Sequence, residues 1–407
     1  MRITTPWHRS RRYTALLVAG TSVVVLAGCG ADAEAGTAGS AGGELVVGTL
    51  MPLSGPQEPL SNSYRSMKAY FDRVNKDGGI GGVKVRLVVR DDQFNPVNTP
   101  SKVRELVDQE KARMLCANQG SGTFKSISSY LAARKIPSLP MSGESSLFTT
   151  GSTGFQLLTP YELTGAHLVR YGVETKKFAR VAIAYTDDGV GGPFLSGARQ
   201  QLEAMGITPV AEVKINAAAT DQTPAAAKLK QSRADLVVFN HVAPVVSQLV
   251  RATDRIGFRP HWGLTYAAQN KQVLELSGDA LDDRATFATP FPDSEAPELA
   301  DYRAAMESTD PKVDRTDFLT VEGWIAGAVC AQVIETAVEK AGGVPSSTQL
   351  LDAMKNTSVD TELVRGLTWS QEERTGQRQL QLLGVSDGTF VPAQDYRPAP
   401  DVELGEG

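Results

Sequence analysis

Short apolar runs alternate with amphipathic segments along most of the chain, and this alternation predicts parallel β-sheets covered by helices on both faces. Residues 45–50 form a first apolar run that is typical of a buried strand. Apolar residues then recur at helical spacing from Tyr64 to Val74, and residues 83–90 alternate in the two-residue period of a strand. The chain therefore begins as strand, helix, strand.

The same order continues through the first half of the chain. Apolar residues at helical spacing around Val103–Val107 precede a short strand at residues 113–117. A further helix, from about residue 123 to residue 134, precedes an apolar segment at residues 136–139. Each predicted strand is thus followed by a helix, as in a doubly wound sheet.

After Pro160 this rhythm restarts, which indicates a second domain of similar architecture. From Glu44 to Tyr396 the chain is long enough for two domains of roughly 100 to 200 residues each. The predicted elements are strands 181–185, 208–215, 236–239, 262–264, 380–385 and 389–391, and helices near 194–205, 225–231, 246–250 and 321–340. Two similar lobes in sequence order imply a cleft between them.

A signal-peptide pattern precedes the folded region. An arginine-bearing start leads to an apolar stretch from Ala15 to Leu26, shorter than the roughly 20 apolar residues of a membrane span. The stretch ends in Leu26-Ala27-Gly28-Cys29, which resembles the bacterial lipobox, in which the cysteine is acylated and becomes the new N-terminal residue. We expect residues 1–28 to be a lipoprotein signal peptide. Cys29 then anchors an extracytoplasmic protein to the outer face of the cell membrane.

Two alternatives to this interpretation stay open. One is a plain secretory leader or an ordinary anchor helix in place of a lipoprotein leader. The other concerns the export route, because Arg11-Arg12 is compatible with twin-arginine export as well as with the Sec route.

The ends of the mature chain differ in composition from its body. Residues 29–43 are mostly Gly and Ala with no periodic apolar face, which is typical of a flexible linker, and we expect residues 397–407 to be a tail. Without the four leader arginines, 37 basic residues face 46 acidic ones, a net charge of -9. This acidic body has no Lys- or Arg-rich run, which argues against a nucleic-acid partner.

Two cysteines remain after Cys29, namely Cys116 and Cys330. In an oxidising compartment they can form a disulfide, but sequence does not show whether their Cα atoms lie within about 7 Å. Because free cysteines are commonly buried as small apolar residues, we expect two separately buried thiols and leave the disulfide as the alternative.

Five motifs, in their order and spacing, resemble the leucine/isoleucine/valine-binding type of the solute-binding proteins of ABC importers. They are VGTLMPLSGP (Val47 to Pro56), KAYFDRVNKDGGIGG (Lys68 to Gly82), VRDDQFNP (Val89 to Pro96), NQGSGT (Asn118 to Thr123) and EGWIAGAVCAQVIETAVEKAG (Glu322 to Gly342). The resemblance covers nearly the whole mature chain. It implies the α/β fold of type I periplasmic binding proteins, with two doubly wound parallel-sheet lobes joined by a three-segment hinge.

The resemblance also implies how the chain is divided and what it binds. The first lobe would hold residues 44–158 and 293–364, and the second lobe residues 159–292 and 366–396. Hinge closure would trap a small-molecule solute between the lobes and present it to an ABC permease in the membrane. We expect a monomer that needs no cofactor and no metal.

Residue chemistry is compatible with such a trap, because ligands of open α/β sheets settle beyond the carboxyl ends of strands. Segment 119–123 lies between a strand and a helix, and it combines flexible glycines, hydroxyl groups and the free N–H groups of a helix start, which favour a carboxylate. Segments 141–145 and 52–56 follow neighbouring strands in the same way. The alternative is that segment 119–123 only caps its own helix.

The family's ligand-binding positions are transferred residue by residue. Gly120 and Ser121, with Thr123 close by, match the loop that grips a ligand carboxylate, and Leu60 matches an apolar wall residue. Glu144 stands where amino-acid binders place a hydroxyl on the ligand ammonium group.

In the second lobe the sequence departs from the amino-acid-binding pattern. Val190 and Val242 stand where the family has aromatic residues, and Thr265 stands where it has an ammonium-binding acid, so the residues do not specify a branched-chain amino acid. Glu144 can restore the missing acid from the opposite lobe; otherwise it is a first-turn acid favoured by a helix dipole. The predicted ligand-binding residues are Ser54, Leu60, Gly120, Ser121, Thr123, Ser142, Gly143, Glu144, Val190, Val242, Thr265 and Tyr266.

An enzyme is the main competing interpretation, and its common motifs are missing. No G-x-S-x-G elbow, S-x-x-K pair or H-E-x-x-H helix occurs, and His167, His241 and His261 have no metal-ligand spacing. We therefore predict a solute-binding lipoprotein of an ABC importer that captures an amino acid or a related carboxylate or amide. The alternative is a ligand-sensing lipoprotein that signals to a membrane receptor.

Overall fold

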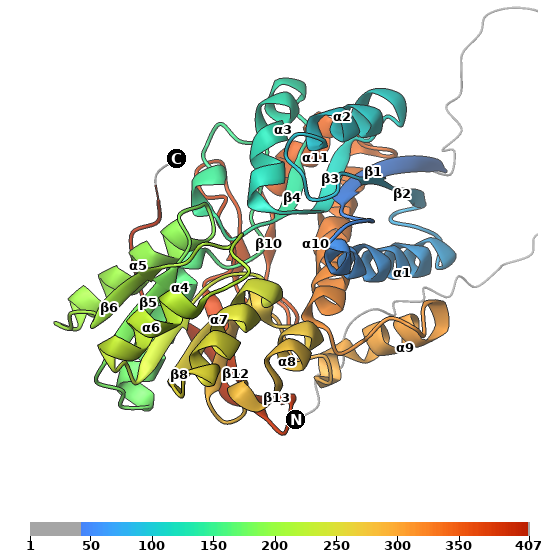
Figure 1. Ribbon diagram of the computed structural model, residues 1–407. Helices are drawn as coiled ribbons and strands as arrows, with labels where there is room; N and C mark the ends of the chain where they lie inside the picture. The colour runs from blue at the N-terminus through green and yellow to red at the C-terminus, as the bar shows by residue number, and fades with distance from the viewer. Residues whose placement is uncertain (1–41, 406–407) are drawn as a thin grey trace, which may run out of the picture. The chain divides into compact units, whose positions relative to one another are not determined.

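The strands of the chain form two main sheets in the computed structural model, which describes residues 42–405. The first sheet has four strands in the order β2-β1-β3-β4, and the second has seven in the order β13-β12-β9-β8-β7-β5-β6. Helices lie on both faces of each sheet (Figure 1). We call the first sheet with its helices the first lobe and the second sheet with its helices the second lobe.

The first sheet is parallel throughout, and its central strand is buried on both faces. Leu45 and Val47 of β1 pack in one cluster of buried apolar residues, whereas Leu50 packs in another on the opposite face. This is why the strand is a continuous apolar run instead of an alternating one. The strands are β1 (Gly43–Met51), β2 (Val83–Asp91), β3 (Met114–Gln119) and β4 (Ser138–Met141).

Two pairs of helices enclose this sheet. α1 and the long α10 pack together on one face, and α2 and α3 pack on the other. α9 packs against α1, and α11 packs against α10. The bounds are α1 (Asn62–Lys76), α2 (Thr99–Arg104), α3 (Ser121–Arg134), α9 (Ala300–Thr309), α10 (Phe318–Ala341) and α11 (Ser347–Met354).

The second sheet is parallel from β6 to β9 and ends in an antiparallel edge, where β12 pairs with both β9 and β13. α4 and α5 cover one face, and α6, α7 and α8 lie on the other. The strands are β5 (Val181–Tyr185), β6 (Ala211–Lys214), β7 (Leu236–Phe239), β8 (His261–Thr265), β9 (Ala285–Thr289), β12 (Gln379–Ser386) and β13 (Thr389–Pro398). The helices are α4 (Tyr161–Arg170), α5 (Gly191–Ala204), α6 (Thr223–Ser232), α7 (Ala243–Arg255) and α8 (Lys271–Ser277).

The chain passes between the lobes in three places: from β4 to α4, from β9 to α9, and from β11 (Leu367–Thr368) to β12. β10 (Ser358–Val359) pairs antiparallel with β11. Gln156 ties the first and third crossings together, because its N–H donates to Arg374 O at 2.9 Å and its Oε1 accepts from Gly376 N at 3.0 Å. The predicted fold class is confirmed, while the residue bounds of the two lobes stay a prediction.

Most predicted elements are present, with shifted ends. Strands 181–185 and 236–239 have the predicted bounds, whereas the strand predicted at 208–215 is reduced to β6. The helix predicted from residue 123 begins at Ser121, so the hydroxyl-bearing segment is the first turn of α3 and not a loop. β9, α4, α8, α9 and α11 were not predicted.

At the two ends the predicted boundaries move inward. β1 begins at Gly43, the last residue of the predicted linker, and β13 extends two residues into the predicted tail. The leader and Cys29 lie outside the described residues.

α10 is the one described helix that is long and apolar enough to cross a membrane. It lies in the core of the first lobe, packed against α1 and β3, and most of its side chains are buried. Its apolar character is therefore explained by burial within the fold.

Cys116 of β3 and Cys330 of α10 form a disulfide, with their Cα atoms 6.5 Å apart. The expectation of two separate thiols was wrong. β3 lies directly against α10, so two fully buried residues that are 214 positions apart in the sequence come within bonding reach. A disulfide is typical of a protein that folds in an oxidising compartment.

Replacement of both cysteines by alanine is expected to lower the free energy of unfolding by about 2–5 kcal/mol, because the bridge closes a long loop in the unfolded chain. Urea unfolding of the double variant and of the wild type, both without reductant, measures this difference. Wild-type protein unfolded in reductant serves as the control and should approach the variant; equal stability of all three would contradict the prediction.

Candidate functional site

Loops from both lobes meet at the carboxyl ends of their parallel strands. A side chain at Gly189, after β5, would collide with the Glu144 carboxylate, after β4. A side chain at Gly143 would in the same way collide with the ring of Tyr161 and the hydroxyl group of Tyr266. Both glycines therefore permit close contact between the lobes at the edge where ligands of α/β sheets bind.

The loop between β3 and α3 presents a helix start to this edge. Gly120 is the N-cap residue with φ 95°, a conformation that favours glycine, and none of the described side chains caps the helix. Its first-turn N–H groups therefore suit an anion. Ser121 Oγ lies 2.6 Å from Ser142 Oγ, which joins this loop to the one after β4.

The Thr123 hydroxyl, unlike that of Ser121, bonds to the backbone of its own turn. Its hydroxyl donates to the carbonyl oxygen of Gln119 and, at 2.9 Å, to that of Gly120, and the side chain is buried. The Thr123 hydroxyl thus stabilises the turn before α3. Ser121 is the hydroxyl of this segment that faces the neighbouring loop.

Buried hydrogen bonds at the end of β3 hold the start of the β3–α3 loop in place. Gln119 Nε2 donates to Ser63 Oγ at 3.0 Å and to Glu322 Oε2 at 2.8 Å. Glu322 lies on α10 and is almost completely buried, and this burial raises its pKa to about 8. Sequence reasoning did not select Gln119 or Glu322, because their contact depends on how α10 packs under β3.

The loop after β4 holds a buried acid. Glu144 is 8 % exposed, its N–H donates to Ser142 Oγ at 3.1 Å, and its Oε1 accepts from Ser146 Oγ at 3.3 Å. Burial raises the pKa of the Glu144 carboxyl, although the positive charge of Lys125 opposes this. Glu144 is the N-cap residue of a short 3-10 helix, Ser145–Leu147, and its side chain does not cap that helix.

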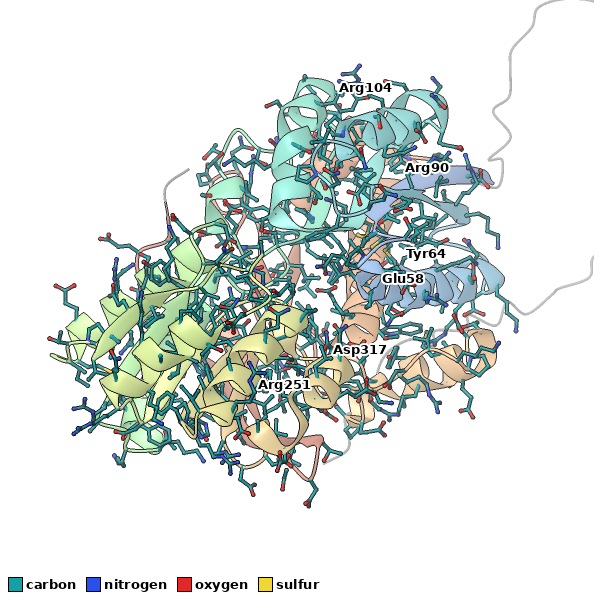
Figure 2. The ribbon with its side chains drawn as sticks, in the orientation of Figure 1. Glu58, Tyr64, Arg90, Arg104, Arg251 and Asp317 are labelled. Atoms are coloured by element: carbon teal, nitrogen blue, oxygen red, sulfur yellow. A yellow bond between two sulfur atoms is a disulfide. The ribbon has the colours of Figure 1, made fainter. Side chains whose placement is uncertain are left out.

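Tyr266 of the second lobe is enclosed by aromatic rings. Its ring stacks on Tyr161 with centroids 6.0 Å apart and on Phe318 at 5.9 Å, and Phe318 stacks on Phe291 at 5.7 Å. Its hydroxyl donates to Thr159 O, in the first crossing, at 2.6 Å. These stacked rings connect Tyr266 of the second lobe with Phe318, the first residue of α10. Asp317, which is labelled in Figure 2, directly precedes Phe318 and is the N-cap residue of α10.

The other predicted positions of the second lobe face their own lobe. Thr265 Oγ1 donates to Asn240 Oδ1 at 2.5 Å, and Asn240 Nδ2 donates to Val190 O at 3.2 Å. Val190 packs partly buried against the cluster of apolar residues that includes β5 and α5, and Val242 packs against the cluster that includes β7 and α7. These three residues shape the loops after β5, β7 and β8.

Asp188 lies close enough to Glu144 to act on its charge, and His241 lies beside Asp188. Asp188 Oδ1 accepts from Thr186 Oγ1 at 2.8 Å and from Gly191 N at 2.9 Å, so it stabilises the turn before α5. Burial raises the pKa of Asp188, but these hydrogen bonds outweigh burial and the net pKa is lowered. Its Oδ2 is 3.9 Å from His241 Nε2, and its charge raises the pKa of Glu144.

In the first lobe, Ser54 belongs to the loop after β1. Ser54 Oγ donates to Asp91 Oδ2 at 2.6 Å and accepts from Gln93 Nε2 at 3.3 Å. Leu60 is partly buried against the core next to α1. The loops after β1 and β2 are therefore hydrogen-bonded to each other.

Two surface hollows lie elsewhere, beside α1. One is lined by side chains of α1 and β2, including Lys84. Glu58 and Tyr64, both labelled in Figure 2, line the other, where Arg65 pairs with Asp310 at 3.1 Å. Both hollows are open to solvent and lined by charged groups, so the strand-end loops are the better candidate for an enclosed ligand site.

Comparison with known proteins agrees with this geometry. The family described as "Periplasmic binding protein" matches residues 44–389. The chain belongs to the periplasmic binding protein family. The family is one of substrate-binding proteins, and its periplasmic character implies a location outside the cytoplasm.

Among its relatives is a Leu/Ile/Val-binding protein, BraC3, of Rhizobium johnstonii, which is 24 % identical over 86 % of this chain and 94 % of its own length. An amino acid binding protein of Pseudomonas aeruginosa is 26 % identical over 51 % of this chain, and the match spans only 56 % of that relative.

Two solved structures share the fold of this periplasmic binding protein. One is a branched chain amino acid ABC transporter protein from Thermus thermophilus with bound valine, with a TM-score of 0.77 and 21 % identity over 88 % of this chain and 97 % of the other. The second is a fatty acid ABC transporter substrate-binding protein from Thermomonospora curvata, with a TM-score of 0.78 and 18 % identity over 89 % and 95 %.

The buried Glu322 makes folding stability depend on pH. An acid whose pKa is raised in the folded state holds its proton there after the unfolded chain has lost it. Stability therefore falls as pH rises from the ordinary glutamate value of 4.5 towards about 8, by at most about 1.4 kcal/mol per pH unit.

Glu322→Gln should remove this contribution while keeping an acceptor for Gln119. We expect the stability of the variant relative to the wild type to increase between pH 5 and pH 8, as measured by urea unfolding at both values. All other titrating groups are shared, so a stability difference that stays constant with pH would contradict this role of Glu322.

Proposed function

We propose that this periplasmic binding protein is the extracytoplasmic solute-binding lipoprotein of an ABC importer. It captures a small polar solute, an amino acid or a related carboxylate or amide, between its two lobes. The observation that carries the proposal is the contact between the lobes at the strand ends, where Glu144 meets Gly189 and Gly143 meets Tyr266. The linked hydroxyls of Ser121 and Ser142 adjoin Glu144.

The β3–α3 loop supports binding of the solute carboxylate. The N-terminus of α3 provides uncapped N–H groups and a favourable dipole, and the Ser121 and Ser142 hydroxyls lie next to it. Gly120 has a positive φ and no side chain, which gives this helix start its conformation. Thr123 contributes by holding this turn.

Glu144 supports an amine on the solute. A buried carboxylate is costly unless a cation pairs with it, and the charge of Asp188 acts against it from the second lobe. A solute ammonium group between the two acids would offset this repulsion. This argument favours an amino acid, the class named for the valine-bound neighbour, over a fatty acid, which carries no positive charge.

Tyr266 and Gly143 would complete the enclosure. Tyr266 and Tyr161 of the second lobe are both buried and pack against Gly143 of the first lobe. Hinge motion of lobe 44–158/293–364 relative to lobe 159–292/366–396 would then open and close the site. The closed form differs in shape from the open one, which lets a permease distinguish the loaded protein.

We place this monomer outside the cell membrane, held by lipid on Cys29. The motif Leu26-Ala27-Gly28-Cys29 supports the anchor, and the buried disulfide supports an oxidising compartment.

A thermal-shift screen with L-valine, L-leucine and octanoate should show a raised melting temperature with an amino acid, because a solute that binds the folded protein stabilises it.

Ser121→Ala and Ser142→Ala are expected to weaken binding of that amino acid by about 1.5–3 kcal/mol each, as for lost hydrogen bonds to a charged group. Titration calorimetry measures the affinities. The matched control is Ser129→Ala, an exposed serine of α3; equal affinity in all three variants would reject the assignment.

Glu144→Gln distinguishes an amino acid from a fatty acid. We expect the variant to lose affinity for L-leucine by about 1.5–3 kcal/mol, because the ammonium group loses its ion pair. Affinity for octanoate should stay equal or rise. Calorimetric titration with both solutes tests this. A variant that binds L-leucine as tightly as the wild type would contradict the proposed role of Glu144.

A further inference from the structure

The loop between β2 and α2 has an unusual backbone. Gln93 and Phe94 are consecutive non-glycine residues in the left-handed region, with φ 57° and φ 56°. Side chains rarely adopt this conformation, and it persists only where the surroundings enforce it. Such backbone outliers concentrate at ligand-binding sites.

Two carboxylates enforce the conformation. Asp91 Oδ1 accepts from Gln93 N at 2.9 Å and from Leu53 N at 3.0 Å. The buried Asp92 accepts from Phe94 N at 3.0 Å through Oδ1 and from Thr99 Oγ1 at 3.0 Å through Oδ2. The loop is thus fixed at its start, at both strained residues and at the first turn of α2.

The result of this conformation is the placement of the Phe94 ring on Gly120. A Cβ atom at Gly120 would lie 2.5 and 2.8 Å from two atoms of the ring. Phe94 is only partly buried, and it belongs to none of the three apolar clusters formed by the described residues. Its ring therefore does not serve the hydrophobic core.

The same loop also reaches a second predicted ligand-binding residue. Gln93 Nε2 donates to Ser54 Oγ at 3.3 Å, and Asn98 Nδ2 donates to Gln93 Oε1 at 3.1 Å. The loop after β2 therefore links the other two loops, because Gln93 bonds to Ser54 after β1 and the Phe94 ring lies on Gly120 after β3.

We infer that Phe94 is a specificity-determining residue whose ring, seated on Gly120, limits the size of the solute group that lies at the start of α3. This inference rests on the proposed function and deepens it. In that orientation the solute carboxylate lies at the N–H groups of the α3 start, and the ring fills the side of Gly120 that a bulkier acyl substituent would need. A pocket wall that excludes one or two carbon atoms discriminates by roughly 10- to 200-fold.

The test compares L-leucine with L-leucine N-methylamide, which is bulkier at the carboxyl end, by calorimetric titration. The wild type should prefer L-leucine, and Phe94→Ala should reduce this preference at least about tenfold. The matched control is Val97→Ala, in the same loop and 83 % exposed, which should keep the wild-type preference. Phe94→Leu should give an intermediate ratio, and it replaces Phe94→Ala if that variant does not fold.

Each other outcome has a definite meaning. If L-leucine binds to the wild type and the ratio of affinities in Phe94→Ala changes less than twofold, or both affinities fall equally, the inference is wrong and the proposed function stands. If neither wild type nor Val97→Ala binds L-leucine, L-valine or octanoate, the proposed function fails and the role of Phe94 with it. Melting temperatures without solute confirm that each variant is folded.

Discussion

The attachment of β3 to α10 is the constraint on which the candidate site depends. Two separate links hold this strand to the helix: the disulfide between Cys116 and Cys330 and the hydrogen bond from Gln119 to Glu322. Both links are buried, so the cost of leaving a polar group unpaired keeps the second one formed. The residue after Gln119 is Gly120, and the position of the α3 start follows directly from this attachment.

Contact between the lobes depends on small residues opposite large or charged ones. Gly189 faces Glu144, and Gly143 faces Tyr266. A buried carboxylate beside a second acid is costly in a closed protein, and the positive charge of Lys125 offsets this cost only in part, because the pKa of Glu144 stays raised. The same contacts that bring the lobes together therefore also select the charge of what lies between them.

Sequence reasoning identified the architecture because the spacing of apolar residues and the length of apolar runs are local properties of the chain. β5 and β7 were predicted with their bounds, since each is a continuous apolar run between helical patterns. β9 was missed because its sequence, Ala-Thr-Phe-Ala-Thr at Ala285–Thr289, has only one large apolar residue and is not a continuous apolar run like β5 and β7. Motif resemblance selected Gly120, Ser121 and Glu144 as candidates. It gave no role to Phe94, Gln119 or Glu322, which stand inside the quoted motifs but whose contacts depend on packing.

By itself the sequence determined the alternation of strands and helices, the family and the loops that carry polar residues. Each of these depends on patterns within short stretches of the chain. Only the tertiary structure decided that Cys116 bonds to Cys330, that the Thr123 hydroxyl serves its own turn and that Phe94 lies on Gly120. These facts are distances between groups remote in sequence or orientations within one turn. They are set by the packing of helices on the sheets, which no local pattern specifies.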